Sequence, residues 1–369
     1  MKNSRKILSL VLAALMLVSC FAFASCGNTG GDAAGTNNDA GTNQGEVNAD
    51  GYNIPIVCGE TGMNDICGVA TYGVNYYNLG VAAGDMAADI LLEGADVSAM
   101  PVQLDPAPAL TISATVPSAI GFTVPESVTA KSSTGDTTIA VTPVADAIVA
   151  EGGDFTVGIL QLVQHVALDQ SNKGFQDQLS VRMSEAGKTV TILDQNAAND
   201  QSNCVTIADS FVAQNVDLIY SIATPAAQAA ASSTEESGTP VLFCAVTDPI
   251  SSGLTESMDV PGGNVSGVSD INPVSDQIDL IAELLGKEDI KIGLLYTSAE
   301  ANSVFQINLA KAQCDAKGYA YVDKGLGDIN DIEAAFIALA AEGVDAIYIP
   351  TDNGLANGAA NVHAINIGG

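Results

Sequence analysis

The sequence contains no tryptophan, and only two of its 369 residues are histidine. Basic residues are also scarce, since 12 lysines and arginines stand against 43 aspartates and glutamates and the net charge is −31 at pH 7. A chain this acidic lacks the basic patch that nucleic acids require, so we expect no nucleic-acid partner. Hydrophobic residues make up 47% of the chain, which excludes a wholly disordered protein and suffices for the cores of about two domains.

Motifs that carry catalysis or bind metals are missing as well. The chain has no G-x-S-x-G elbow, no paired Cys/His motif, and neither the H-E-x-x-H nor the C-x-x-C spacing. The short stretches GETG and TDNG lack the further glycines and the lysine of a phosphate-binding loop. We therefore expect a protein that is not an enzyme and needs no cofactor or metal.

The first 26 residues have the pattern of a secretory signal. Basic residues precede the apolar run ILSLVLAALMLVS, and the small-residue segment FAFASCGN follows it. The segment resembles the lipobox of bacterial lipoproteins, with Cys26 as the expected lipidated residue and Cys20 as the alternative; a secretion signal without lipid stays open. Residues 27–52 are rich in Gly, Asn, Asp and Thr and are expected to form a flexible tether at the extracellular face of the bacterial cytoplasmic membrane.

Five cysteines follow the leader: Cys58, Cys67, Cys204, Cys244 and Cys314. An odd number argues against a complete disulfide framework. Cys204 and Cys244 lie in apolar helix and strand patterns, which predicts buried thiols. Pairing of Cys58 with Cys67 stays open.

From residue 155 onward, short apolar strands alternate with helical patterns. The expected strands are TVGILQLV, TVTILD, VDLIYSI, PVLFCAV, NVSGVS, IKIGLLY, YAYVD and VDAIYIP, and a helical segment stands between most neighbouring strands, the first starting near Asp169. This alternation predicts βαβ units, so we expect an α/β fold of two lobes, each a parallel sheet flanked by helices. Residues 155–250 are assigned to the first lobe and residues 264–369 to the second.

The front of the folded chain is incomplete by itself. Residues 53–130 offer the strand NIPIVCGE, a helix from about residue 77 to 94 and the β-prone piece PAPALTISATVP. The last helical segment of the chain, GLANGAANVHAINIGG, has no strand after it, and NIPIVCGE has no helix before it. Joined together they would make one ordinary helix-to-strand connection. The sequence therefore predicts that residues 53–130 supply a second-lobe strand, a first-lobe helix and a second-lobe tail.

Several stretches together resemble a known family. ILQLVQHVALD, IATPAAQAAA, FCAVTDPISSGL, PGGNVSGVSDINPV, LLYTSAEANSV, AIYIPTDN and ATYGVNYYNLG are similar to segments of the ABC-transporter substrate-binding proteins that include tryptophan- and tyrosine-binding lipoproteins. The resemblance implies a type I periplasmic-binding fold. In that family the ATYG segment comes last, so this chain resembles a circular permutant, with residues 131–154 as the linker. The expected hinges are residues 249–264, 70–76 and 95–103.

The resemblance also implies the ligand site. A buried amino acid needs donors for its carboxylate and an acceptor for its ammonium group. The helix N-termini at Thr224-Pro225 and at Ser298 are expected to donate, and Asp352 or Glu60 to accept. The full expected set is Gln161, His165, Thr224, Pro225, Thr247 and Asp248 from the first lobe, with Ser298, Glu300, Asn302, Ser303, Asp352, Asn353 and Glu60 from the second.

For some of these residues a purely structural role stays open. Thr224 and Ser298 could only cap helices, and Asp248 could only shape a turn. Tyr76 and Tyr77 are expected to be hinge and packing residues. Val166 stands where the family has proline, and CGETGM surrounds Glu60, so the pocket for the ligand's side chain is expected to differ from that of relatives.

The function implied is that of a monomeric, lipid-anchored substrate-binding protein of an ABC importer, which closes on a small ligand, an aromatic amino acid first, and delivers it to a permease. The alternative is a surface-tethered sensor or scavenger with the same fold and no transporter.

Overall fold

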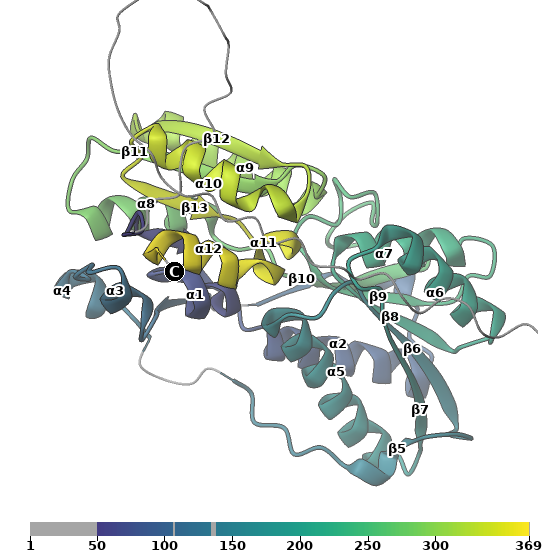
Figure 1. The fold of residues 1–369 in the computed structure, drawn as a ribbon. Helices are drawn as coiled ribbons and strands as arrows, with labels where there is room; N and C mark the ends of the chain where they lie inside the picture. The colour runs from purple at the N-terminus through teal and green to yellow at the C-terminus, as the bar shows by residue number, and fades with distance from the viewer. Residues whose placement is uncertain (1–49, 106–107, 134–137, 369) are drawn as a thin grey trace, which may run out of the picture. The chain divides into compact units, whose positions relative to one another are not determined.

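The computed structural model describes residues 50–368 apart from 106–107 and 134–137 (Figure 1). The expected signal sequence, Cys20, Cys26 and nearly all of the tether lie outside these residues. Within the described ranges, none of the helices combines the length and apolar character needed to cross a membrane.

Sheet A has six strands, all parallel to their neighbours except β4, which runs antiparallel to β2. In spatial order its strands are β12 (Ala320–Leu326), β11 (Lys291–Thr297), β13 (Ala346–Ile349), β1 (Ile56–Cys58), β2 (Ala70–Gly73) and β4 (Ala109–Ile112). Strands from the two ends of the described chain are therefore neighbours, because β1 pairs with β13 on one side and β2 on the other.

Helices cover both faces of sheet A. Side chains alternate between the two faces along each strand, so the sheet presents apolar side chains on both. Val57 of β1 joins one apolar core and Ile56 and Cys58 join another. The first core is closed by α3 (Val116–Ala119), α4 (Glu126–Thr129), α8 (Val274–Leu285) and α9 (Ala301–Lys317). The second is closed by α1 (Thr61–Cys67), α10 (Ile332–Ala341), α11 (Asn353–Asn357) and α12 (Ala359–Ile367). A short 3-10 helix, η3 (Ile329–Asp331), precedes α10.

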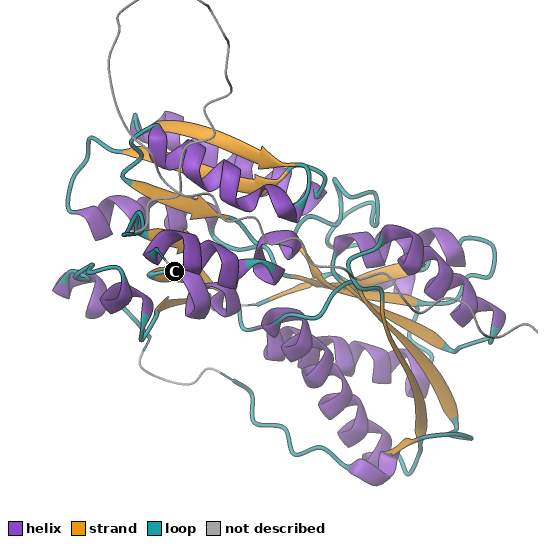
Figure 2. Ribbon diagram, in the orientation of Figure 1, coloured by secondary structure: helices purple, strands orange, loops and turns teal. Residues whose placement is uncertain are grey.

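Sheet B has seven strands, all parallel. In spatial order they are β3 (Gln103–Leu104), β10 (Val265–Ser269), β9 (Val241–Val246), β8 (Leu218–Ile222), β6 (Phe155–Gln161), β7 (Val190–Asn196) and β5 (Ile148–Val149). Figures 1 and 2 show α2 (Tyr76–Glu93) with α5 (Val166–Glu185) on one face, and α6 (Gln201–Ala213) with α7 (Thr224–Thr234) on the other. Two 3-10 helices, η1 (Val97–Ala99) and η2 (Ala145–Ala147), lie beside the sheet.

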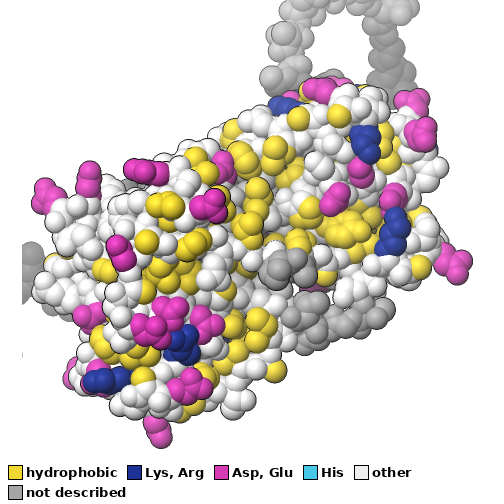
Figure 3. Space-filling view, turned by 180° about the vertical axis from the view of Figure 1, so that it is seen from behind, with side chains coloured by type: hydrophobic (Ala, Val, Ile, Leu, Met, Phe, Trp, Pro, Cys, Tyr) yellow, Lys and Arg dark blue, Asp and Glu magenta, His cyan; other side chains and the backbone are white. Residues whose placement is uncertain are grey.

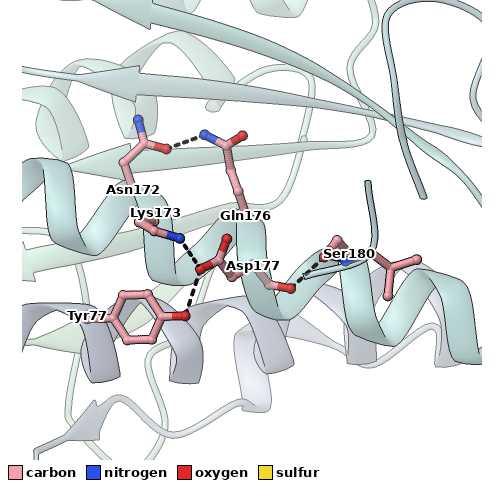
Figure 4. Close-up of polar contacts among 7 residues, drawn as sticks. Tyr77, Asn172, Lys173, Gln176, Asp177 and Ser180 are labelled. Carbon is pink, nitrogen blue, oxygen red and sulfur yellow. Dashed lines mark hydrogen bonds and ion pairs between the residues drawn. The ribbon is translucent and has the colours of Figure 1, made fainter. Parts of the chain in front are cut away.

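Helices α2 and α5 approach closely at glycines. A Cβ at Gly80 would lie 2.1 Å from the carbonyl oxygen of Ser171, and one at Gly174 would lie 2.1 Å from that of Tyr77, so neither position accepts a side chain without movement. The Tyr77 hydroxyl donates to Asp177 at 2.7 Å, and Lys173 pairs with the same carboxylate at 2.5 Å (Figure 4). Tyr77 thus holds α2 against α5, as a packing residue should.

Parallel pairing corrects two expectations. Strand β10 pairs with β9 along Val265–Ser269, so these residues lie in the same sheet as residues 155–246 and not with the second-lobe segment. Residues 249–264 consequently join two neighbouring strands of one sheet and do not cross between sheets, so they are not a hinge. The chain instead crosses from sheet B to sheet A after Ser269.

Three further boundaries differ from the sequence reading. The expected linker, residues 131–154, contains β5, which pairs with β7 at the edge of sheet B. Helix α5 begins at Val166 rather than at Asp169, which makes His165 its N-cap residue. The last helical segment is two helices, because the chain breaks at Gly358 between α11 and α12.

Candidate functional site

Polar side chains from both sheets meet at one buried cavity. Its volume is about 10 Å³, close to the minimum for one water molecule. It is lined by Glu60, Tyr76, His165, Leu168, Ala245, Asp270, Asn302, Thr351, Asp352, Asn353 and Ala356. Most of these residues follow the carboxyl ends of parallel strands or begin helices, which is where ligands bind in open α/β sheets.

Asp270 lies at the end of β10, on the sheet B side of the cavity. Its carboxylate accepts hydrogen bonds from the Tyr76 hydroxyl at 2.7 Å and the Thr247 hydroxyl at 3.0 Å. Burial raises the pKa of Asp270 above its usual value. A carboxylate offers about four acceptor positions, so two donors leave Asp270 with capacity for a further cationic donor.

Glu60 joins β1 to α1 and is 1% exposed. It caps α1, because its carboxylate accepts from the backbone N–H of Gly62 at 2.5 Å and from that of Met63. Burial raises the pKa of Glu60 to about 7, although the two backbone donors oppose the rise. The charges of Asp65 and Asp270 add to the rise.

Asp352 and Glu300 form the sheet A side and are already satisfied by the chain. Asp352 caps α11 and accepts from Leu355 N–H at 2.8 Å, Thr297 N–H at 2.6 Å and the Thr297 hydroxyl at 2.8 Å. Glu300 accepts from Asn353 N–H at 3.0 Å, the Asn353 amide at 2.7 Å and Gly354 N–H at 2.9 Å. Burial, followed by the charge of Asp352, raises the pKa of Glu300 to about 7.

Two buried polar atoms of the lining residues have no hydrogen-bond partner in the described chain: His165 Nε2 and Asn302 Oδ1. Burial lowers the pKa of His165 to about 4, so the imidazole is neutral at pH 7 and one of its ring nitrogens carries a proton. A buried polar group without a partner is costly. The pair therefore offers one group that can donate and one that accepts to a molecule in the cavity.

Two alanines at strand ends adopt a left-handed backbone. Ala223 follows β8 with φ +86°, and Ala245, in β9, lines the cavity with φ +56°. Non-glycine residues in this region are strained, and such strain collects at functional sites. The sequence gives no signal of this strain, because alanine is not a residue typical of positive φ angles.

Of the thirteen residues expected from the sequence, the structure places five on the cavity: Glu60, His165, Asn302, Asp352 and Asn353. Two others support lining residues directly. Thr247 donates to Asp270, and Glu300 holds Asn353. Ser303 is fully buried beside them, and the Asn302 amide donates to its hydroxyl at 3.4 Å.

The remaining five expected residues, like Thr247, Glu300 and Ser303, do not line the cavity. Gln161, the last residue of β6, donates to Val163 O in the following loop at 2.9 Å and to Asp169 in the first turn of α5 at 2.7 Å. Asp248 accepts a hydrogen bond from Ile250 N–H at 3.2 Å, which shapes a turn. Ser298 is exposed, and its hydroxyl donates to the carbonyl oxygen of Leu326.

Thr224 and Pro225 open α7 away from the cavity lining. Ala223 and not Thr224 is the N-cap residue. The Thr224 hydroxyl is buried and has no hydrogen-bond partner in the described chain. Pro225 stands in the first turn, where a missing N–H costs nothing.

Six lining residues were not expected: Tyr76, Leu168, Ala245, Asp270, Thr351 and Ala356. The sequence does contain a signal for Asp270. This residue directly follows the strand NVSGVS, and ligands in open α/β sheets bind at the carboxyl ends of the strands. Assigning that strand to the second lobe hid the signal. Tyr76 was expected to be a hinge and packing residue; it is buried in the core around α2, and its hydroxyl also donates a hydrogen bond to Asp270.

The surface is strongly acidic, and eight of the nine lysines and arginines that the structure describes form ion pairs with carboxylates. Figure 3 shows one face, on which acidic side chains are spread widely and the few lysines and arginines lie among them. Arg182, for example, contacts Asp85 and Asp89, each at 2.8 Å. None of the described His, Cys, Asp and Glu residues form a group of three or more suited to a metal ion.

Comparison with known proteins gives concordant matches. A family model for ABC transporter substrate binding proteins matches residues 41–135 and 156–366. The tyrosine-binding protein of Clostridioides difficile (strain R20291) is 39% identical over 197 residues, which are 53% of this chain and 56% of that protein, so the chain spans little more than half of this relative.

Two solved structures share the fold with substantial identity. The ABC domain from Streptococcus pneumonia in complex with L-Trp is 38% identical, with a TM-score of 0.53, over 57% of this chain and 70% of that one. A conserved domain protein from Vibrio cholerae is 36% identical, with a TM-score of 0.52, over 56% and 71%. The expected α/β fold of the type I periplasmic-binding class is confirmed. This chain belongs to the ABC transporter substrate-binding protein family.

Proposed function

We propose that this protein is the extracellular, lipid-anchored binding component of an ABC importer, and that it closes on an aromatic α-amino acid between sheets A and B and delivers it to a permease. Members of this family are binding proteins and not enzymes. The observation that carries the proposal is the buried cavity with carboxylates on both sides and no lysine or arginine among its lining residues.

The charge of the cavity selects the ligand's cationic group. Glu60, Asp270 and Asp352 bring three carboxyls to one small space, where burial makes an uncompensated negative charge costly. An ammonium group supplies the missing positive charge and several N–H donors. Asp270 is the proposed acceptor, because only two side-chain hydroxyls occupy it, and Asn302 Oδ1 is the second acceptor.

The carboxylate of the ligand needs donors, and His165 is the proposed one. Its imidazole is neutral, its Nε2 atom lies buried without a partner, and it lines the same cavity as Asp270. The aromatic side chain is proposed from relatives, because one is named a tyrosine-binding protein and another was solved with L-Trp. Leu168, Ala245 and Ala356 supply apolar lining for it.

Binding requires the cavity to enlarge. A volume of about 10 Å³ holds one water molecule at most, whereas an amino acid is many times larger. The two sheets are joined at the site by hydrogen bonds such as Val74 N–H to Asn272 Oδ1 at 3.1 Å. A ligand that contacts both sides favours the closed state, because only that state allows all of its contacts. The proposed hinges are the segments where the chain crosses between the sheets, after Gly73, Leu104 and Ser269.

The experiment is a thermal-shift screen of the purified chain with each of the twenty amino acids. Tryptophan and tyrosine are expected to raise the melting temperature most, because a ligand that binds only the native state stabilises it. A screen in which no amino acid shifts the melting temperature would contradict the amino-acid proposal.

The circular permutation is proposed as well. Support comes from the contact of α12 with the segment before β1: Asn366 Nδ2 donates to Ile54 O at 2.8 Å, and Ile54 N–H donates to Asn366 Oδ1 at 2.9 Å. A chain reordered so that residues 144–369 come first and residues 50–130 follow is expected to keep the melting temperature and the ligand. Loss of folding on reordering would count against the permutation.

A further inference from the structure

Two buried thiols lie together beside the candidate site. Cys58 ends β1 and Cys67 ends α1, and their sulfur atoms are 3.9 Å apart, with exposures of 0% and 1%. A disulfide has an S–S distance of about 2.05 Å, so the sulfurs need to approach by a little under 2 Å. Side-chain rotation with a small shift of α1 can provide such a movement.

The local sequence makes room for this approach. A Cβ at Gly68 would lie 2.7 Å from Cys58 Sγ and 2.6 Å from Asn64 Oδ1, so a larger residue there would clash with the Cys58 sulfur. Asn64 is fully buried, and neither polar atom of its side chain has a partner in the described chain. The thiol pair therefore lies in a tightly packed region, next to a buried amide whose polar atoms have no partner among the described residues.

The three remaining described cysteines are arranged differently. Cys204, Cys244 and Cys314 are buried as well, but they lie in three separate elements, α6, β9 and α9. Cys244 accepts a contact from the Ser171 hydroxyl at 3.1 Å. Among the five described cysteines, Cys58 and Cys67 are the pair whose sulfur atoms lie within 4 Å of each other.

We propose that Cys58 and Cys67 are a redox pair that forms an intramolecular disulfide outside the cell, and that this bond fixes the Glu60 end of the ligand cavity. With a small disulfide as oxidant, the thiolate of one cysteine attacks it, forms a mixed disulfide and releases one small thiol. The thiolate of the other cysteine then displaces the second small thiol. Two protons leave the protein thiols and the two small thiols carry the electrons away.

Reactivity depends on the folded state. Burial, followed by the hydrogen bond and charge of Cys67, raises the pKa of the Cys58 thiol, which keeps it protonated and slow to react in the folded dithiol. The bond is therefore expected to form readily during folding and slowly in the native protein. Once formed, it is shielded from reductants by the same burial.

The bond acts on the site through α1. The loop that it closes contains Glu60, which caps α1 and lines the cavity. Fixing the end of α1 to the end of β1 restricts the motion of this carboxylate when the cavity opens. The oxidised form is expected to bind a ligand more tightly, by about threefold, because less ordering remains to be done on binding; this step rests on the proposed function.

Mass spectrometry tests the bond independently of ligand. The full chain is refolded with oxidised glutathione, free thiols are alkylated, and the chain is cleaved with cyanogen bromide after Met63, which lies between the two cysteines. The fragments ending at Met63 and beginning at Asn64 are expected to stay linked, with the loss of two hydrogen atoms, and to separate after reduction. Because the first fragment also contains Cys20 and Cys26, the same fragments of Cys58→Ala are expected to be unlinked. Alkylation of both Cys58 and Cys67, or linkage to another cysteine, would overturn the proposal.

Melting temperature and affinity complete the test. Oxidation is expected to raise the melting temperature of the native chain and of Cys204→Ala, but not of Cys58→Ala or Cys67→Ala. Tryptophan titration of oxidised and reduced chain then tests the coupling, and equal affinities with the bond present would overturn it. Absence of tryptophan binding in both forms, with the linked fragments observed, would contradict the ligand and leave the bond established.

Discussion

The two sides of the cavity use the same residue type in different ways. On the sheet A side, Asp352 and Glu300 accept hydrogen bonds from backbone N–H groups at helix N-termini and from neighbouring side chains. On the sheet B side, Asp270 accepts hydrogen bonds from the hydroxyls of Tyr76 and Thr247 and from no other side chain that the structure describes. A buried carboxylate therefore indicates a ligand site only where the protein itself does not fill all of its hydrogen-bond acceptor positions.

Replacement of the open carboxylate should have the largest effect on binding. Asp270→Asn keeps the shape but removes the charge, so affinity for an amino acid is expected to fall at least about 30-fold, as expected for the loss of one partner of a buried ion pair. Titration calorimetry measures the effect. Asp194→Asn, a charge removal on β7 away from the cavity, is the matched control and should bind as the native chain does.

An affinity of Asp270→Asn within threefold of the native value would remove Asp270 from the site. The melting temperature of this variant should not fall, because burial raises the pKa of Asp270 and so disfavours its charge.

Replacement of the satisfied carboxylate should act mainly on folding. Asp352→Ala leaves Thr297 N–H, the Thr297 hydroxyl and Leu355 N–H without their acceptor. The free energy of unfolding is expected to drop by about 2–4 kcal/mol, measured by urea denaturation. A variant with native stability and lost affinity would reverse the roles assigned to the two sides.

The pH dependence of stability follows from Glu60 and Glu300, whose pKa values are both raised to about 7 from an ordinary 4.5. Between these values the native state binds more protons than the unfolded state, so stability falls as pH rises. The melting temperature without ligand is expected to decrease from pH 5 to pH 8. Glu60→Gln should flatten this slope, and the exposed Glu283→Gln should not.

A melting temperature that rises steadily over this range would contradict the raised pKa values of Glu60 and Glu300.

Neighbouring tyrosines give the smallest effects and the finest comparison. Tyr76 donates to Asp270 and Tyr77 donates to Asp177, each at 2.7 Å. Tyr76→Phe is expected to weaken ligand binding by about threefold to tenfold, because one charge-assisted hydrogen bond that orients Asp270 is lost. Tyr77→Phe should lower the melting temperature slightly and leave affinity unchanged. Equal effects of both substitutions on affinity would show that Tyr76 acts only through helix packing.

Most of the fold could be predicted from the sequence because alternating apolar strands and helical patterns are local signals. Placement of β1 in sheet A and of α2 against sheet B agrees with the sequence analysis, whereas β2 forms within residues 70–76, which were expected to be a hinge. Assignment of β10 went wrong because all strands here are short and apolar, and only pairing with β9 decides which sheet a strand joins. The loop at 249–264 looked like a crossing for the same reason.

The site was partly predictable because residues at helix starts and strand ends are readable from sequence. Glu60, His165, Asn302, Asp352 and Asn353 were expected and line the cavity. Sequence could not show that Asp352 and Glu300 are satisfied by Thr297 and Asn353 while Asp270 is not. That distinction depends on hydrogen bonds between segments far apart in the chain.

The most direct test of the central claim is a fluorescence titration with tryptophan, because the protein has none of its own. Tryptophan is compared with tryptamine, which lacks the carboxylate, and with indole-3-propionate, which lacks the ammonium group. Saturable binding of tryptophan is predicted, with tryptamine weaker and indole-3-propionate weakest, because the ammonium meets the open carboxylate of Asp270. Binding of indole-3-propionate as tight as that of tryptophan would contradict the account.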